Sequence, residues 1–208
     1  DSIASTLLTK DLTNELNKKV QVLNVSAGSW GPDNCYAYLK ERGDFNAKLL
    51  FLVVSSHDAY DVMDFKPVID RVDRYESKQY KLATWELVSR YLIPRITKNI
   101  SSEVTGVPNK SLRFNSGFAD ILQYCKEQDK PFFIYLNPDT TEVNTHKYKK
   151  EGDLIQSFCK SNQLECLNGL EHASIEDYRG IIHLNEKGQK KMANQIREAI
   201  IRRKAQLK

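Results

Sequence analysis

A serine at the start of the chain and four histidines along it are the residues that point first to nucleophilic chemistry. A serine hydroxyl attacks an ester only when a base within hydrogen-bond reach removes its proton, so Ser2 needs an imidazole close by. The histidines are His57, His146, His172 and His183. His146 lies in a polar loop and His172 in a turn, so we expect both to be solvated surface residues. Spacing alone does not choose between His57 and His183.

Four short segments concentrate polar and glycine residues at predicted strand ends or just before a helix. They are Asp1-Ser2, the sequence Asn-Val-Ser-Ala-Gly-Ser-Trp-Gly at 24–31, Ser-Ser-His-Asp at 55–58, and Gly-Ile-Ile-His-Leu-Asn at 180–185. In order and spacing these segments resemble the four blocks of the SGNH, or GDSL-type, hydrolase family. The resemblance covers nearly the whole chain and is weakest at about 64–110. It implies a serine ester hydrolase that needs no cofactor.

The first three blocks assign the nucleophile and the oxyanion donors by resemblance. Asp1-Ser2 matches the last two letters of the family's Gly-Asp-Ser block, which makes Ser2 the nucleophile. The second block implies a main-chain N–H donor at Ser29, with Gly28 as the neighbouring possibility. In the third block His57 stands where the family has asparagine, and a neutral imidazole still keeps one ring N–H to donate.

The fourth block supplies the base. His183 and the residues after it match the family's Asp-x-x-His pattern, but Gly180 stands where the aspartate belongs. Such a carboxylate fixes the tautomer of the imidazole and stabilises the imidazolium. A backbone carbonyl or Asp177 is the expected substitute, and either would lower the rate without abolishing it.

The resemblance favours removal of short acyl groups, such as acetyl, from a carbohydrate ester. Trp30 follows the oxyanion position and is expected to lie near the acyl group. One alternative keeps the site and transfers the acyl group to a polysaccharide hydroxyl. Another is a catalytically silent carbohydrate-binding domain, motivated by the departures at His57 and Gly180.

The acidic and cysteine residues predict no metal site. Asp58, Asp61 and Asp64 lack a supporting set of ligands and are expected to cap the turn that follows the strand. The four cysteines lack the paired spacing of a zinc site. Cys159 and Cys166 flank a predicted turn and could form a disulfide.

The predicted elements alternate between strands and helices. Continuously apolar strands indicate burial on both faces, so the sequence predicts a three-layer α/β/α sandwich with a doubly wound, mainly parallel sheet, and the resemblance makes it flavodoxin-like. Strands are predicted over 20–25, 49–54, 131–136 and 164–167. Helices are predicted over about 4–17, 32–42, 79–91, 111–127, 147–160 and 186–204.

We expect one domain over 1–208, interrupted by an insertion at about 64–110 that has no convincing strand. No strand precedes Asp1 in the sequence, so we also expect a strand and any targeting segment upstream, with an extracytoplasmic location as the favoured hypothesis. A net charge of +4 over 208 residues, spread along the chain, argues against a nucleic-acid partner. No stretch reaches the roughly 18 apolar residues of a membrane span.

Overall fold

The computed structural model describes residues 3–28, 30–62, 78, 80–93 and 113–204. Its contacts divide the chain into two compact units, one made of residues 1–63 with 109–208 and the other of residues 64–108. In the second unit a short helix, α3 (Ala83–Leu87), continues into a π-helical turn at Val88–Leu92. The predicted helix at 79–91 is therefore confirmed over part of its length, and most of the predicted insertion lies outside the described residues.

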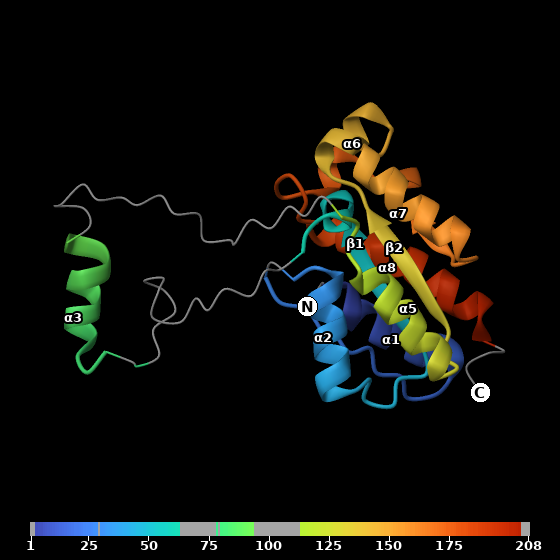
Figure 1. The fold of residues 1–208 in the computed structure, drawn as a ribbon, viewed down its shortest axis with the longest axis horizontal. Helices are drawn as coiled ribbons and strands as arrows, with labels where there is room; N and C mark the ends of the chain where they lie inside the picture. Colours follow the sequence, from blue (N-terminus) through green and yellow to red (C-terminus); the bar gives the residue numbers. More distant parts are fainter. Residues whose placement is uncertain (1–2, 29, 63–77, 79, 94–112, 205–208) are drawn as a thin grey trace. The chain divides into compact units, whose positions relative to one another are not determined.

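The first unit is built on a parallel sheet (Figure 1). Its described strands are β1 (Leu50–Ser55), β2 (Phe132–Asn137) and β3 (Cys166–Asn168), in the order β1-β2-β3. All six residues of β2 are buried, as the continuous run of apolar residues predicts for a strand covered on both faces. The mixed α/β class with a parallel sheet is confirmed.

Side chains that alternate along β2 fall into two separate cores. Ile134 and Leu136 pack with α5 (Gly117–Glu127) and α7 (Lys150–Ser161), whereas Phe133 and Tyr135 pack with the first and last described helices of the unit. Those two helices are α1 (Ala4–Leu16) and α8 (Glu186–Arg202). Figure 1 shows α5 and α7 in front of the sheet and α1 and α8 behind it, so each face carries its own pair of helices.

Two further α-helices belong to the described part of the unit. Helix α2 (Pro32–Arg42) packs against α5 and has the predicted bounds, with a proline at its first position and Gly43 directly after its end. Helix α6 (Thr140–Thr145) was not predicted. Its N-cap is Asp139, whose carboxylate accepts a hydrogen bond from the Glu142 amide at 2.9 Å.

The predicted strand over 20–25 is wrong. The segment carries no strand ladder, and the N–H groups of Val20 and Val22 instead donate to the hydroxyls of Thr13 and Thr9, at 3.2 and 3.0 Å. These backbone N–H groups are therefore hydrogen-bonded to threonine hydroxyls of α1 and are not available to pair with a neighbouring strand. The apolar residues of this segment still contribute to the core, because Val20 and Val22 pack against the α1 and α8 cluster.

The predicted helix over 111–127 begins later, at Gly117, because the Asn115 side chain accepts a hydrogen bond from the Gly117 amide at 2.8 Å. All four cysteines are free thiols, so the alternative of a disulfide is not realised. The thiols of Cys159 and Cys166 are nevertheless hydrogen-bonded, which raises the pKa of Cys159. Among the described residues no helix combines the length and apolar character that crossing a membrane requires.

Candidate functional site

The carboxyl ends of β1 and β2 carry the polar residues of the candidate site, since parallel strands end at the same edge of a sheet. A 3₁₀ turn at Ser56–Ala59 follows β1 and presents His57 to solvent, with about half of its side chain exposed. The backbone N–H of Ser55 donates to Asp58 Oδ2 at 2.7 Å, so Asp58 caps the turn as predicted. This hydrogen bond closes the turn and so fixes the backbone position from which the His57 side chain extends.

The His183 loop is held at the end of the neighbouring strand. The N–H of Thr140 donates to the Ile181 carbonyl at 2.9 Å, and the Asn137 amide lies 3.4 Å from the Ile182 carbonyl. Because Asn137 is the last residue of β2, these contacts fasten the loop at the carboxyl edge. His183 itself is exposed.

The residues after His183 form the start of α8 as predicted. Asn185 is the N-cap of this helix and accepts a hydrogen bond from the Gly188 amide at 3.2 Å. Gln189, one turn into the helix, accepts a hydrogen bond at 3.0 Å from the N–H of Ala4, which begins α1. The first residues of α1 therefore lie against the first turn of α8.

The other residues predicted for the site have different outcomes. Ser2 and Ser29 lie outside the described residues. Gly28 is exposed, and Trp30 packs against Tyr38 with 5.7 Å between ring centroids. His146 and His172 are exposed, which confirms the prediction of surface residues.

Asp177 was predicted as a carboxylate partner for His183, and the described contacts give it other partners. Its buried carboxylate accepts hydrogen bonds from Lys191 at 2.6 Å and from the Ser174 amide at 2.7 Å, and no described contact joins it to His183. Burial alone would raise the pKa of Asp177, but the hydrogen bonds from Lys191 and Ser174, together with the charge of Lys191, outweigh burial and hold the pKa below its usual range. This carboxylate therefore joins its turn to α8.

At Gly180, where the sequence resemblance led us to expect an aspartate, the structure leaves room for a side chain. A Cβ atom on Gly180 would meet no heavy atom within 4 Å, and its φ is not in the left-handed region. The glycine is therefore not required by local packing. Among the described residues no carboxylate is hydrogen-bonded to the imidazole of His183.

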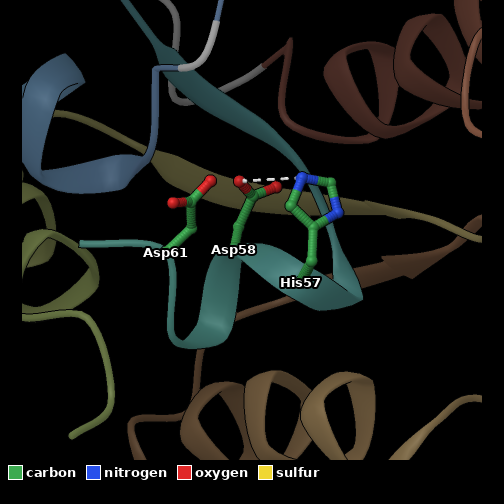
Figure 2. A group of neighbouring side chains, drawn as sticks. All are labelled: His57, Asp58 and Asp61. Carbon is green, nitrogen blue, oxygen red and sulfur yellow. Dashed lines mark ion pairs between the residues drawn. The ribbon is translucent and has the colours of Figure 1, made fainter. Parts of the chain in front are cut away.

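A cluster of charged side chains surrounds the turn after β1 (Figure 2). His57 Nε2 lies 3.7 Å from Asp58 Oδ1, and the Asp61 carboxylate lies on the other side of Asp58. Burial raises the pKa of Asp58 to about 6, although His57 counteracts it, and burial likewise raises the pKa of Asp61. Asp33, in the first turn of α2, adds to both increases by repulsion. Asp64, predicted as a third capping residue, lies outside the described residues.

Two buried polar residues that hold this region were missed by the sequence analysis. Asn115 is fully buried, and its amide nitrogen donates to Asp33 Oδ1 at 3.1 Å and to the Asp61 carbonyl at 2.7 Å. Glu142 is almost fully buried and accepts a hydrogen bond from the Ser56 hydroxyl. An asparagine just before an amphipathic helix is a typical capping residue, so the role of Asn115 could have been predicted from the sequence. The contact between Glu142 and Ser56 could not, because the two residues are far apart in the sequence.

Comparison of the chain with models of protein families, with curated proteins and with solved structures found no match, so the site rests on its own geometry.

Proposed function

We propose that the chain is a serine ester hydrolase of the SGNH type, with the flavodoxin-like, doubly wound α/β fold of that family. In this proposal Ser2 is the nucleophile, His183 is its base, and the substrate is a short acyl ester, such as an acetyl group on a carbohydrate. The observation that carries the proposal is the hydrogen bond from the Ala4 N–H to Gln189 Oε1.

This hydrogen bond limits how far the nucleophile can lie from its base. Ser2 precedes Ala4 by two residues, a span of at most about 7 Å. Gln189 follows His183 by six residues, of which the last four belong to the compact first turn of α8. Ser2 and His183 are thus each a few residues in sequence from one of the two partners in the Ala4–Gln189 hydrogen bond. This supports His183, rather than another histidine of the chain, as the base for Ser2.

The arrangement of the strand ends supports the role of His57. It follows β1, the direct neighbour of β2, and the His183 loop is fastened at the end of β2. An imidazole at this edge can donate a ring N–H to the oxygen of a bound ester, together with the main-chain N–H groups of Ser2 and Ser29. These three donors would stabilise the oxyanion of the tetrahedral intermediate.

The reaction would follow a double displacement. Ser2 Oγ attacks the carbonyl carbon while His183 takes the hydroxyl proton, and the same imidazole then protonates the departing alcohol. Water attacks the acyl-enzyme with His183 again as base, which releases the acid and regenerates Ser2. Because no carboxylate in the described part of the chain is hydrogen-bonded to His183, the imidazolium formed in each step would be stabilised less, so we expect a slow enzyme.

A second candidate function has one observation in its favour. The contacts of Asp177 with Lys191 and Ser174 leave His183 without the substitute carboxylate that the sequence offered. A catalytically silent carbohydrate-binding domain would have no need of it. Saccharide binding without turnover of any acyl ester would favour this alternative.

Labelling with a fluorophosphonate probe, followed by mass mapping of the modified residue, tests the proposal. We expect modification at Ser2 that disappears in His183→Ala and in Ser2→Ala. His172→Ala removes another exposed histidine and should leave labelling unchanged, which makes it the matched control. No labelling of folded protein, or labelling that His183→Ala does not affect, would overturn the proposal.

A further inference from the structure

Exposed apolar side chains gather on the described helical segment of the second unit. Six of the thirteen large apolar residues that are exposed in the described part of the chain lie within 82–93. They are Leu82, Trp85, Leu87, Tyr91, Leu92 and Ile93. No residue of α3 is buried, and Trp85 is 57% exposed. Exposed apolar side chains at this density are typical of a binding surface.

The spacing of these residues makes the apolar surface wide. Trp85, Val88 and Leu92 follow one another at intervals of three and four residues, the spacing at which positions on a helix share a face. Leu87 and Tyr91 are four residues apart and form a neighbouring stripe. The π-helical turn at Val88–Leu92 keeps such pairs close, because its hydrogen bonds join residues i and i+5.

Basic residues accompany this apolar surface in the sequence. Between Glu76 and Glu103 there are five Lys or Arg residues and one acidic residue, Glu86. This stretch therefore has a net charge of +4, equal to that of the whole chain, so basic and acidic residues balance elsewhere. Lys78 and Lys81, which precede α3, are exposed. The count refines the expectation that the net charge is spread along the chain.

An anionic lipid bilayer complements both features. Trp and Tyr are enriched where headgroups meet acyl chains, and aliphatic side chains of surface helices insert at the same depth. Lys and Arg are attracted to the negatively charged headgroups. A nucleic acid would also attract the basic residues, but its phosphate backbone offers no apolar contact to the leucines.

The length of the helical segment fixes how it would meet a bilayer. The five residues of α3 and the five of the π-helical turn together span about 15 Å. The hydrocarbon core of a bilayer is roughly 30 Å thick. A helix of this length therefore lies along the membrane surface, with its apolar face toward the acyl chains.

From these observations we infer that the helical segment at 82–93, with Lys78 and Lys81, binds the surface of an anionic membrane. Its apolar side chains exchange contact with water for contact with acyl chains, and its basic residues add an attraction that salt screens. The inference goes beyond the proposed ester hydrolysis and does not depend on it, because binding to vesicles is measured without any ester.

The test is co-sedimentation of the chain with vesicles made of equal parts phosphatidylglycerol and phosphatidylcholine. We expect binding that weakens as salt is added, and binding at least about tenfold weaker to vesicles of phosphatidylcholine alone. In Trp30→Phe the only tryptophan is Trp85, so its fluorescence reports on this helix. Its emission should move to shorter wavelength when anionic vesicles are added.

Two leucines of equal exposure test the apolar contribution. Leu92→Gln should weaken binding to the anionic vesicles at least about tenfold, since a buried leucine side chain contributes at least that much to a partition constant. Leu23→Gln is the matched control, because Leu23 is 47% exposed against 46% for Leu92 but belongs to the first unit. It should bind as the unmodified chain does.

Two pairs of exposed lysines test the charge. The double variant Lys78→Gln with Lys81→Gln should bind the anionic vesicles at least about tenfold more weakly, since each basic residue near the surface contributes to the attraction. Lys18→Gln with Lys19→Gln removes the same charge from exposed residues after α1 and should bind normally. Circular dichroism should be unchanged in every variant, because all the replaced side chains are exposed.

Three results would overturn the inference. One is the absence of binding to anionic vesicles, or equal binding by Leu92→Gln and Leu23→Gln. Another is a Trp85 emission that is already at short wavelength without vesicles and does not change when they are added, since the protein itself would then cover this surface. The third is self-association of the chain that Leu92→Gln abolishes, without vesicle binding, which would assign the surface to a second copy.

Discussion

The backbone N–H of Ala4 donates a hydrogen bond to Gln189 Oε1 at 3.0 Å, although 185 residues separate the two. Through this contact the first turn of α1 meets the first turn of α8. The proposed nucleophile precedes one partner and the proposed base precedes the other. Side-chain and backbone atoms of two distant segments thus set the geometry on which ester hydrolysis would depend.

Gln189→Leu should lower both stability and activity. The variant leaves the Ala4 N–H without its acceptor, which costs about 1 kcal/mol in the free energy of unfolding, and kcat for a p-nitrophenyl ester should fall severalfold. Gln189→Glu keeps an oxygen acceptor and should retain most of the activity. Urea denaturation and initial rates measure the two effects, and equal rates for both variants would count against the positioning role.

Gly180→Asp should increase the rate of ester hydrolysis. The new Cβ meets nothing within 4 Å, so the side chain is accommodated, and its carboxylate would stand in the family's position three residues before His183. Since loss of such a carboxylate costs about 10⁴ in kcat in a well-studied serine protease, we expect a gain of at least about tenfold. Gly180→Asn has the same size without the charge and should give little gain. A rate for Gly180→Asp no higher than that of Gly180→Asn contradicts this prediction.

His57→Ala should reduce kcat by about 10² to 10³, the usual effect of removing one oxyanion donor. His57→Asn supplies an amide N–H, the donor that SGNH hydrolases have in the third block that this segment resembles, and should retain most of the rate. Initial rates with a p-nitrophenyl ester measure both effects. Equal activity of His57→Ala and the unmodified chain would remove this residue from the oxyanion hole.

Lys191→Met should destabilise the fold in a pH-dependent way. The contact of Lys191 with Asp177 keeps the pKa of that carboxyl below its unfolded value, so the stabilisation is present above about pH 4 and is lost as the pH falls. Breaking a fully buried pair costs roughly 3 to 5 kcal/mol, but the Lys191 side chain is 36% exposed, and we expect about 2 kcal/mol at pH 7.

Urea denaturation of this variant at pH 7 and at pH 3 gives the comparison. The difference from the unmodified chain should shrink at the lower pH. Lys190→Met removes a neighbouring exposed lysine and should have little effect at either pH. A difference that stays constant with pH would mean that Lys191 acts through packing alone.

Much of the fold follows from local patterns in the sequence. The continuous apolar run of β2 and the capping signals of α2 and α8 predicted those elements to within a residue or two. The segment at 20–25 has the same composition as a strand, but hydroxyls of Thr9 and Thr13 bind its N–H groups. Composition does not reveal which partner a backbone donor will find.

The candidate site was less predictable, because its geometry depends on contacts between distant segments. The sequence offered Asp177 as a partner for His183, yet Lys191 on α8 binds that carboxylate first. Asp58 and Asp61 were predicted as capping residues, and the cap at Asp58 is present. Helix α2 brings Asp33 to the same cluster, and Asn115 is hydrogen-bonded to both Asp33 and the Asp61 carbonyl. This arrangement depends on how the helices pack, which neither spacing nor composition reveals.

The pairing of α1 with α8 also has a consequence for the order of folding. One face of β2 is covered by α5 and α7, which flank it closely in sequence, and this half of the core can form while the chain is still being synthesised. The other face is completed only when α8, which follows all three described strands in the sequence, has been made. Until then Phe133 and Tyr135 lack their contacts with α8 and have only α1 to cover them, so a ribosome stalled before α8 would hold a partly covered apolar face that chaperones bind.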